Sequence, residues 1–329
     1  LTEVSRSAPT AATSSLYLIL QLAATMKWDI TIGDVRTAFL NSRPQHREKG
    51  PMYCSVPRNG SLPGVADDVL LELVRPLYGQ VDAPLLWHRE LSSFLVEDCG
   101  LKVSKLDPCR FMLFRGGVLA GVIITVVDDL MMTGNKMMVP VFQKLRARFN
   151  FGKWAMHEGK YCGRWISQDP VSKEITVKQH EDIMKLQPMK VDKAGRKPED
   201  PCSPMEVSEL RTVVGSLAWF ASQSLPDVGG DVAMAQAIFP NPCLDDVRRV
   251  NKIVAMMVEN EVVLHFRHIP FDDITFLLST DAGWANAAEH KSQAGWIVGA
   301  VSKDINKNVS SVFSPICWKS HRIKRVTSS

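Results

Sequence analysis

Three acidic positions in this sequence follow the same kind of segment. Asp34, Asp128 and Asp281 each end an apolar run that favours a β-strand, and Asp129 comes directly after Asp128. A carboxylate at a strand end is held on a rigid element and still meets water, which suits a metal ligand. Mg²⁺ prefers such oxygen ligands and keeps room for substrate phosphates. The pattern therefore indicates metal-assisted phosphoryl transfer, where holding metals and phosphates in place is most of catalysis.

The Asp128–Asp129 pair is a weak signal by itself. Adjacent side chains in a flat strand point to opposite faces, so these two carboxylates can share a site only at a turn. Residues 130–134 are apolar enough to form the return strand of a hairpin. An aspartate pair after a strand is, however, also common in solvated turns, and the pair alone leaves both interpretations open.

The periodicity of apolar residues predicts the elements that must position these aspartates. A helix is expected over residues 14–27, followed by a short strand over residues 28–34. Residues 110–115 and 118–127 predict a hairpin around Gly116-Gly117, and its second strand is apolar on both faces, as a central strand would be. Further helices are expected over 84–97, 139–149, 206–222 and 244–259, further strands over 276–281, 294–301 and 312–318, and a linker over 191–204.

Composition excludes several classes of protein. The chain has 329 residues, 45% of them hydrophobic, which is enough for two or three domains with sizeable cores. Seven scattered cysteines without a C-x-x-C pair argue against a disulfide scaffold or a zinc site, and favour reduced thiols in an intracellular compartment. The longest apolar stretch, residues 118–127, is too short to cross a bilayer. The chain begins without methionine, and we expect it to be a piece of a longer protein.

Seven segments carry a further signal through their order along the chain. They are residues 34–41 (DVRTAFLN), 77–84 (LYGQVDAP) with Trp87, 126–130 (VVDDL), 158–161 (EGKY) with Gly163, 210–217 (LRTVVGSL) with Pro226-Asp227, 279–285 (STDAGWA) and 317–320 (CWKS). In this order they resemble the motifs of the copia-type retrotransposon Pol polyprotein, in which a reverse transcriptase precedes an RNase H domain. Each match alone is modest, but the ordered set covers nearly the whole chain and is specific.

The resemblance implies an α/β fold in the broad (α+β) sense. We expect a right-hand polymerase palm with an antiparallel sheet and helices, a helical connector and a truncated RNase H-like sheet. The corresponding domains are residues 1–170 for the fingers and palm without the N-terminal finger strands, 171–268 for the thumb or connection, and 269–329 for the first part of the RNase H-like domain.

The resemblance also implies an RNA-directed DNA polymerase and its site residues. Asp34, Asp128 and Asp129 would be the catalytic carboxylates that bind two Mg²⁺ ions, with Mn²⁺ as a possible substitute. Asp281 would be one carboxylate of an RNase H metal site that is incomplete, because one aspartate cannot hold two metals. The partners would be an RNA template, a DNA primer and deoxynucleoside triphosphates, without a membrane, in a cytoplasmic particle or the nucleus.

Two residues near the incoming nucleotide are implied as well. Phe39 stands where the family places a bulky side chain under the sugar, and a ring there would clash with a 2′-hydroxyl. A phenylalanine after a short strand is otherwise more often a core residue. Gln80 is a candidate to offer its amide to the nucleotide.

The sequence departs from the family pattern at two places. Val126 replaces the usual aromatic residue before the aspartate pair, and Asp82 stands where a glutamine is usual beside the nucleotide. An acidic side chain there would repel a triphosphate. These departures leave a second hypothesis open, a catalytically inactive relic that folds and at most binds nucleic acid.

Overall fold

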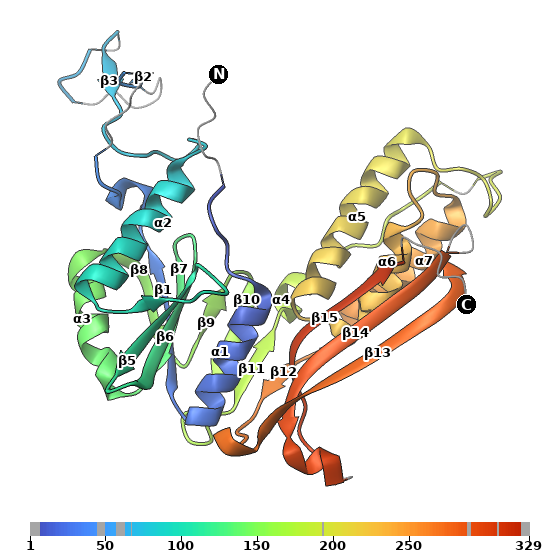
Figure 1. The fold of residues 1–329 in the computed structure, drawn as a ribbon. Helices are drawn as coiled ribbons and strands as arrows, with labels where there is room; N and C mark the ends of the chain where they lie inside the picture. The colour runs from blue at the N-terminus through green and yellow to red at the C-terminus, as the bar shows by residue number, and fades with distance from the viewer. Residues whose placement is uncertain are drawn as a thin grey trace. The chain divides into compact units, whose positions relative to one another are not determined.

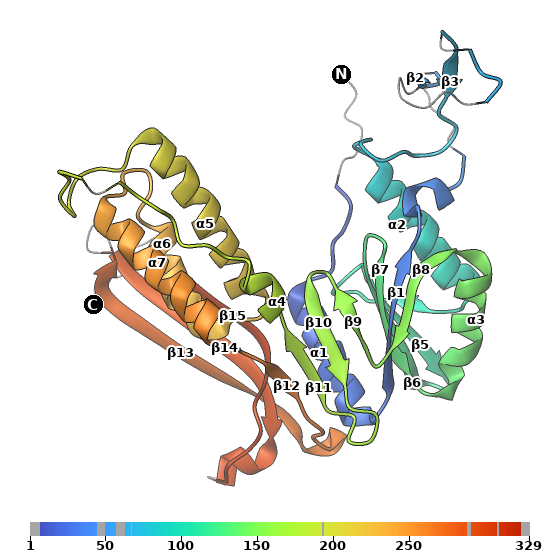
Figure 2. The same cartoon turned by 180° about the vertical axis from the view of Figure 1, so that it is seen from behind.

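The computed structural model describes residues 7–44, 50–56, 63–66, 68–192, 194–287, 291–307 and 309–323, and of residues 284–287 and 291 it describes the backbone alone. The described residues group into two compact units (Figures 1 and 2). The first lies within Leu1–Ser15 and Thr31–Met156, and the second within Leu16–Ile30 and His157–Ser329. Each unit is built around its own sheets and helices.

A six-stranded sheet forms the centre of the first unit. Its strands follow the order β4-β5-β6-β7-β1-β8. Helices α2 and α3 pack on one face and bury a shared apolar core against it (Figure 1). The elements are β1 (Asp29–Val35), η1 (Ala38–Asn41), α2 (Ala83–Ser93), η2 (Phe94–Asp98), β4 (Lys102–Val103), β5 (Arg110–Arg115), β6 (Val118–Val126), β7 (Asp129–Gly134), η3 (Lys136–Met138), α3 (Val139–Arg148) and β8 (Phe151–Met156), with a separate two-stranded sheet of β2 (Tyr53–Ser55) and β3 (Leu70–Glu72).

The hairpins of this sheet follow from the local sequence. Strand β6 is buried at every position from residue 120 to residue 125, as expected for a central strand that is apolar on both faces. Gly116 and Gly117 join β5 to β6 with φ angles of 58° and 81°, which glycine adopts without steric cost. Val126 pairs with Asp129, so the turn between β6 and β7 consists of Val127 and Asp128.

The second unit combines two antiparallel sheets with a group of helices (Figure 2). One sheet has the order β12-β11-β10-β9, and the other is the meander β13-β14-β15. The strands are β9 (Glu158–Tyr161), β10 (Arg164–Gln168), β11 (Ile175–Lys178), β12 (Leu264–Phe266), β13 (Ile274–Ala287), β14 (Lys291–Ser302) and β15 (Ser314–Arg322). The helices are α1 (Thr13–Met26), α4 (His180–Ile183), α5 (Pro204–Gln223), η4 (Pro226–Val228), α6 (Gly229–Gln236), α7 (Leu244–Glu259), η5 (Phe271–Asp273) and η7 (Lys303–Lys307).

Helices α5, α6 and α7 share one apolar core. A capping box starts α5: the Ser203 hydroxyl accepts from the Glu206 N–H, and the Glu206 carboxylate accepts from the Ser203 N–H. Helix α6 lies against β15, and the Trp318 indole N–H donates to the carbonyl of Ala221 in α5 at 2.7 Å. These contacts join the helices to the β13-β14-β15 sheet within the unit.

The expected mixed fold, with antiparallel sheets and several helices, is confirmed. The sequence analysis missed α6 and most of the β9–β12 sheet. In the described part of the chain, no helix combines the length and apolar character that a membrane crossing requires.

Candidate active site

Asp34 and Asp128 lie side by side at one end of the six-stranded sheet. Asp34 is the second-last residue of β1, before Val35. Asp128 is the second residue of the turn between β6 and β7. Strands β7 and β1 are neighbours in the sheet, and the Val35 N–H donates to the carbonyl oxygen of Asp128 at 3.0 Å. This backbone bond fixes the two positions together although they are far apart in sequence.

The two carboxyl groups interact electrostatically. Partial burial raises the pKa of Asp128 above its ordinary value, the negative charge of Asp34 raises it further, and a backbone hydrogen bond opposes both effects. Two neighbouring carboxyl groups offer the oxygen ligands that a divalent cation such as Mg²⁺ prefers.

Strand β8 leaves space for the Asp34 side chain. Asp34 pairs with Lys153, and the neighbouring residue in β8 is Gly152. A β-carbon added at Gly152 would lie 2.8 Å from Asp34 Oδ2 and 3.1 Å from the Arg36 Cγ. Any side chain at residue 152 would therefore displace the carboxylate, so glycine is needed at this position.

Helix α2 anchors the turn that carries Asp128. The fully buried Trp87 donates its indole N–H to the carbonyl oxygen of Val127 at 2.7 Å. Val127 itself has a φ of 54°, an unusual angle for a β-branched residue. Phe149 packs edge-on against Trp87 with ring centroids 5.3 Å apart. The hydrogen bond thus holds the turn in a conformation that its sequence alone would not favour.

Asp129 has a different position from Asp128. It is the first residue of β7, opposite Val126, and is partly buried. Across the ranges that the structure describes, no group of three or more His, Cys, Asp or Glu side chains is arranged to hold a metal. The structure therefore brings Asp34 and Asp128 together without completing a three-carboxylate cluster with Asp129.

Phe39 lies on η1, directly after β1, and only 8% of it is exposed. Its ring packs against Tyr78 with centroids 4.6 Å apart and an angle of 46° between the planes, while Tyr78 is 55% exposed. Sequence analysis did not single out Tyr78, although it belongs to the 77–84 segment. The two rings form an aromatic surface that is open on the Tyr78 side.

The Gln80 amide contacts its own loop and the residue before β2. Its nitrogen donates to Met52 Sδ at 3.4 Å, and its oxygen accepts from the Leu77 N–H at 3.2 Å. These contacts hold the side chain in place.

Asp281 belongs to the second unit, whereas Asp34 and Asp128 belong to the first. It pairs with Gly295 on β14, its side chain is exposed, and its carboxylate accepts from the Ala282 N–H at 2.9 Å. It lines a pocket of about 600 Å³ together with Asp227 and Lys319.

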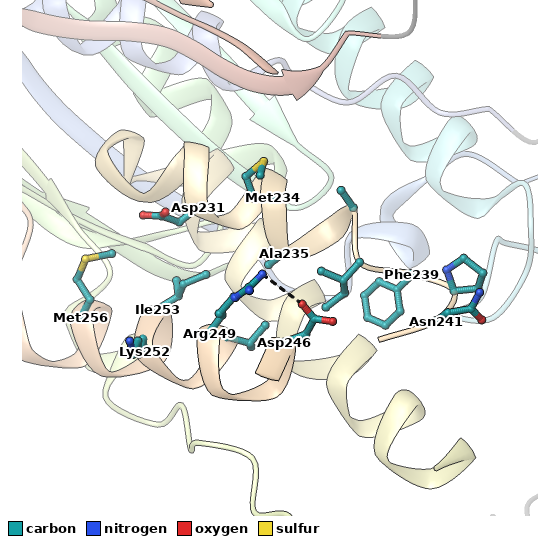
Figure 3. A pocket seen from close by; sticks show the side chains of 14 residues that line it. Asp231, Met234, Ala235, Phe239, Asn241, Asp246, Arg249, Lys252, Ile253 and Met256 are labelled. Atoms are coloured by element: carbon teal, nitrogen blue, oxygen red, sulfur yellow. Dashed lines mark ion pairs between the residues drawn. The ribbon is translucent and has the colours of Figure 1, made fainter. Parts of the chain in front are cut away.

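A larger pocket, of about 820 Å³, lies between α6 and α7 in the second unit (Figure 3). Its wall mixes apolar side chains such as Phe239 and Ile253 with charged ones, among them Arg249, which lies 3.7 Å from Asp246. None of the residues assigned to a site from the sequence lines this pocket. Its size alone assigns it no chemistry.

Comparison with known protein families decides how the Asp34–Asp128 pair is interpreted. Residues 3–194, more than half of the chain, match the reverse transcriptase (RNA-dependent DNA polymerase) family. The chain belongs to the reverse transcriptase family. The matched region of the chain contains both aspartates, Phe39 and Tyr78.

Plant transposon proteins are similar to this chain. The retrovirus-related Pol polyprotein from transposon RE2 of Arabidopsis thaliana is 25% identical over 349 residues, covering 98% of this chain and 22% of that protein. The corresponding polyprotein from transposon RE1 of the same plant is 31% identical over 131 residues, covering 39% of this chain and 8% of its own length. The Pol polyprotein from transposon TNT 1-94 of Nicotiana tabacum is 27% identical over 126 residues, covering 38% of this chain and 9% of that protein.

These relatives confirm the expected similarity to transposon Pol polyproteins. The chain spans about a fifth of the length of the RE2 protein. The similarity to RE2 extends over the second unit as well as the first, because it covers 98% of the chain.

Proposed function

We propose that this chain is the reverse transcriptase segment of a copia-type retrotransposon Pol polyprotein, and that it adds deoxynucleotides to a primer 3′-hydroxyl. The observation that carries this proposal is the meeting of Asp34 and Asp128 at one end of a sheet, inside the region that matches the family. The template would be RNA or DNA, the primer DNA, and the substrates deoxynucleoside triphosphates. The compartment would be a cytoplasmic particle or the nucleus.

The residues present fit a magnesium site. Asp34 and Asp128 offer hard oxygen ligands, and partial burial together with the negative charge of Asp34 raises the pKa of Asp128. Asp129, the next residue, would complete the ligand set. Bound Mg²⁺, or Mn²⁺ in its place, would stabilise the charge on the attacking 3′-oxygen and on the pyrophosphate that leaves.

The reaction is an in-line displacement at the α-phosphate. The primer 3′-oxygen forms a bond to phosphorus, the bond to the bridging oxygen of pyrophosphate breaks, and the hydroxyl proton passes to solvent. The chain's own contribution is to position the groups. Trp87 holds the turn of Asp128, and Gly152 leaves room for the Asp34 carboxylate.

Phe39 would select the sugar. Phe39 packs against Tyr78, and the two tilted rings form an aromatic surface just after the strand of Asp34. A deoxyribose would lie on this surface, whereas a 2′-hydroxyl would collide with it. Gln80 would turn its amide toward the nucleotide only after leaving its contacts with Met52 and Leu77.

We assign the larger parts of the structure on the same grounds. The six-stranded sheet with α2 and α3 would be the palm, residues 171–268 the thumb or connection, and the β13-β14-β15 sheet the beginning of an RNase H-like domain. Asp281 would be one carboxylate of that domain's metal site. A single carboxylate cannot hold two metals, so we propose no RNA cleavage by the residues described.

A second candidate function is an inactive relic that binds nucleic acid. It is favoured because, within the described ranges, no three acidic, histidine or cysteine side chains are arranged to hold a metal. Val126 and Asp82 also depart from the family pattern. This candidate predicts binding of a primer–template duplex without extension.

Primer extension separates the two candidates. The 329-residue chain is assayed with Mg²⁺ on an RNA template with a labelled DNA primer, beside Asp128→Asn and the matched control Asp98→Asn, an exposed aspartate on η2. We expect extension by the wild-type and control chains, and a loss of about 100-fold or more in Asp128→Asn. Equal extension by Asp128→Asn would refute the assigned role, and duplex binding without any extension would support the second candidate.

A further inference from the structure

A small pocket in the first unit lies where the segment after η1 meets helix α2. Its volume is about 430 Å³, and its wall includes Ser42 and Arg43 from that segment and Arg89, Glu90 and Ser93 from α2. Both parts of the wall continue from segments already assigned to the site, since η1 carries Phe39 and α2 carries Trp87. The roles proposed for Phe39 and Trp87 do not involve Ser42, Arg43 or Arg89.

Positive charge dominates this pocket. Only 7% of Glu90 is exposed, and its carboxylate contacts Arg43 Nε at 3.1 Å with one oxygen and an Arg148 nitrogen at 2.9 Å with the other. Arg89 is exposed and, within the residues that the structure describes, has no acidic partner. Of the side chains that line the pocket, Arg43 and Arg89 are positive and Glu90 is negative, which leaves an excess of one positive charge.

A buried hydroxyl supplies the second observation. Ser42 is only 2% exposed, and among the described residues its Oγ has no hydrogen-bond partner. Buried hydroxyl groups are normally hydrogen-bonded, because water no longer satisfies them. Ser42 lines the pocket, so an oxygen-rich ligand there would provide the missing partner.

We propose that this pocket binds a phosphate group. Guanidinium forks and serine hydroxyls are donors that match phosphate oxygens, and Glu90 does not oppose the ligand because arginines engage both of its oxygens. Glu90 instead holds Arg43 beside the pocket, where a second Arg43 nitrogen lies 3.5 Å from Ser93 Oγ. The inference rests on the proposed polymerase function, which offers two sources of phosphate: the nucleic-acid backbone and the nucleotide triphosphate.

Direct binding measurements test the pocket without requiring catalysis. The variants are Ser42→Ala, Arg89→Gln and the double variant Arg43→Gln/Arg89→Gln. The matched control is Arg148→Gln, which loses the same charge and the same Glu90 partner but does not line the pocket. Arg89→Gln breaks no ion pair among the described residues and should not destabilise the chain. Binding by Arg89→Gln therefore still tests the pocket if the double variant unfolds.

The first arm measures a labelled primer–template duplex by fluorescence anisotropy over a range of salt concentrations. If the phosphate belongs to the nucleic-acid backbone, the double variant binds about tenfold more weakly, and the slope of log K against log salt flattens by about one. Ser42→Ala weakens binding less and leaves the slope unchanged, since it removes no charge. Arg148→Gln stays near the wild-type values.

The second arm measures dATP binding by calorimetry with the duplex bound. If the phosphate belongs to the nucleotide, the double variant weakens dATP binding about tenfold and leaves duplex affinity and its salt slope unchanged. The proposal is overturned if the pocket variants change neither affinity by more than Arg148→Gln does. Failure of the polymerase proposal would instead appear as absent primer extension, which neither binding arm measures.

Discussion

At the scale of single residues, the site combines groups that are individually unfavourable. Partial burial raises the pKa of Asp128, and the negative charge of the neighbouring Asp34 raises it further. Val127 beside them has a φ of 54°. Trp87 stabilises this arrangement through its hydrogen bond to Val127. Such local cost, retained beside a candidate metal site, is typical of functional residues.

Phe39 provides a prediction at this scale. Phe39→Val should improve the use of ribonucleotides relative to deoxynucleotides by about tenfold or more, because the shorter side chain no longer meets the 2′-hydroxyl. The ratio of kcat/KM for the two sugars measures this change. Phe94→Val is the matched control, since Phe94 belongs to the same core and is also 8% exposed.

Both substitutions should lower the free energy of unfolding by a similar amount, about 1–3 kcal/mol, as core truncations do. Only Phe39→Val should change sugar selection. An unchanged ratio in Phe39→Val, together with a loss of stability, would make Phe39 a core residue without a selective role.

At the scale of elements, strands β1 and β8 pair directly beside the Asp34 carboxylate. Gly152 in β8 faces the Asp34 carboxylate, and this contact depends on the pairing of β1 with β8. The sequence predicted β1, the β5–β6 hairpin and the long helices because their apolar periodicity is strong. It did not predict α6, which begins with two glycines that disfavour a helix, so packing against α5, α7 and β15 must stabilise it.

The pairing of β8 with β1 leads to a prediction. Gly152→Ala should reduce primer extension about tenfold or more, because the new β-carbon would lie 2.8 Å from Asp34 Oδ2 and displace it. Gly215→Ala is the control, since no atom lies within 4 Å of its added β-carbon. Wild-type extension rates in Gly152→Ala would show that the position of the Asp34 carboxylate does not limit the reaction.

Helix α5 gives a pH-dependent prediction. The Arg196 guanidinium and the Ser203 N–H lower the pKa of Glu206 to about 2. The stabilisation is therefore present above the ordinary pKa near 4.5 and is lost as the pH falls toward 2. Glu206→Gln should lower the free energy of unfolding by about 1 kcal/mol at pH 7.

Denaturant unfolding followed by circular dichroism at several pH values measures this effect. The difference between Glu206→Gln and the wild type should shrink as the pH falls from 5 toward 2. A difference that stays constant over that range would contradict the role of the ionised carboxylate in the cap.

At the scale of the whole molecule, the sequence predicted the family, but it predicted little of how the strands pair. Periodicity locates β1 and the turn of Asp128, but the pairing of β7 with β1 is a long-range contact that no local pattern specifies. Only the ordered motifs suggested that Asp34 and Asp128 meet. The roles of Trp87 and Gly152 became visible only in the structure. Trp87 bonds to Val127 and Gly152 faces Asp34, and in both cases the partners are distant in sequence.

The short strands of the second unit show the same limit. Strands β9 to β12 have three to five residues each, too few for a clear period. Strand β12 pairs with β11 across a long stretch of sequence that contains α5, α6 and α7. The sheet is therefore determined by packing of the complete unit rather than by its own segments.

Binding of Mn²⁺, followed by electron paramagnetic resonance, tests the central claim that Asp34 and Asp128 share a divalent cation. The wild-type chain is titrated beside Asp34→Asn, Asp128→Asn and the control Asp98→Asn. We expect each of the first two substitutions to weaken Mn²⁺ binding about tenfold or more, and Asp98→Asn to leave it unchanged. Wild-type affinity in both Asp34→Asn and Asp128→Asn would contradict the shared site.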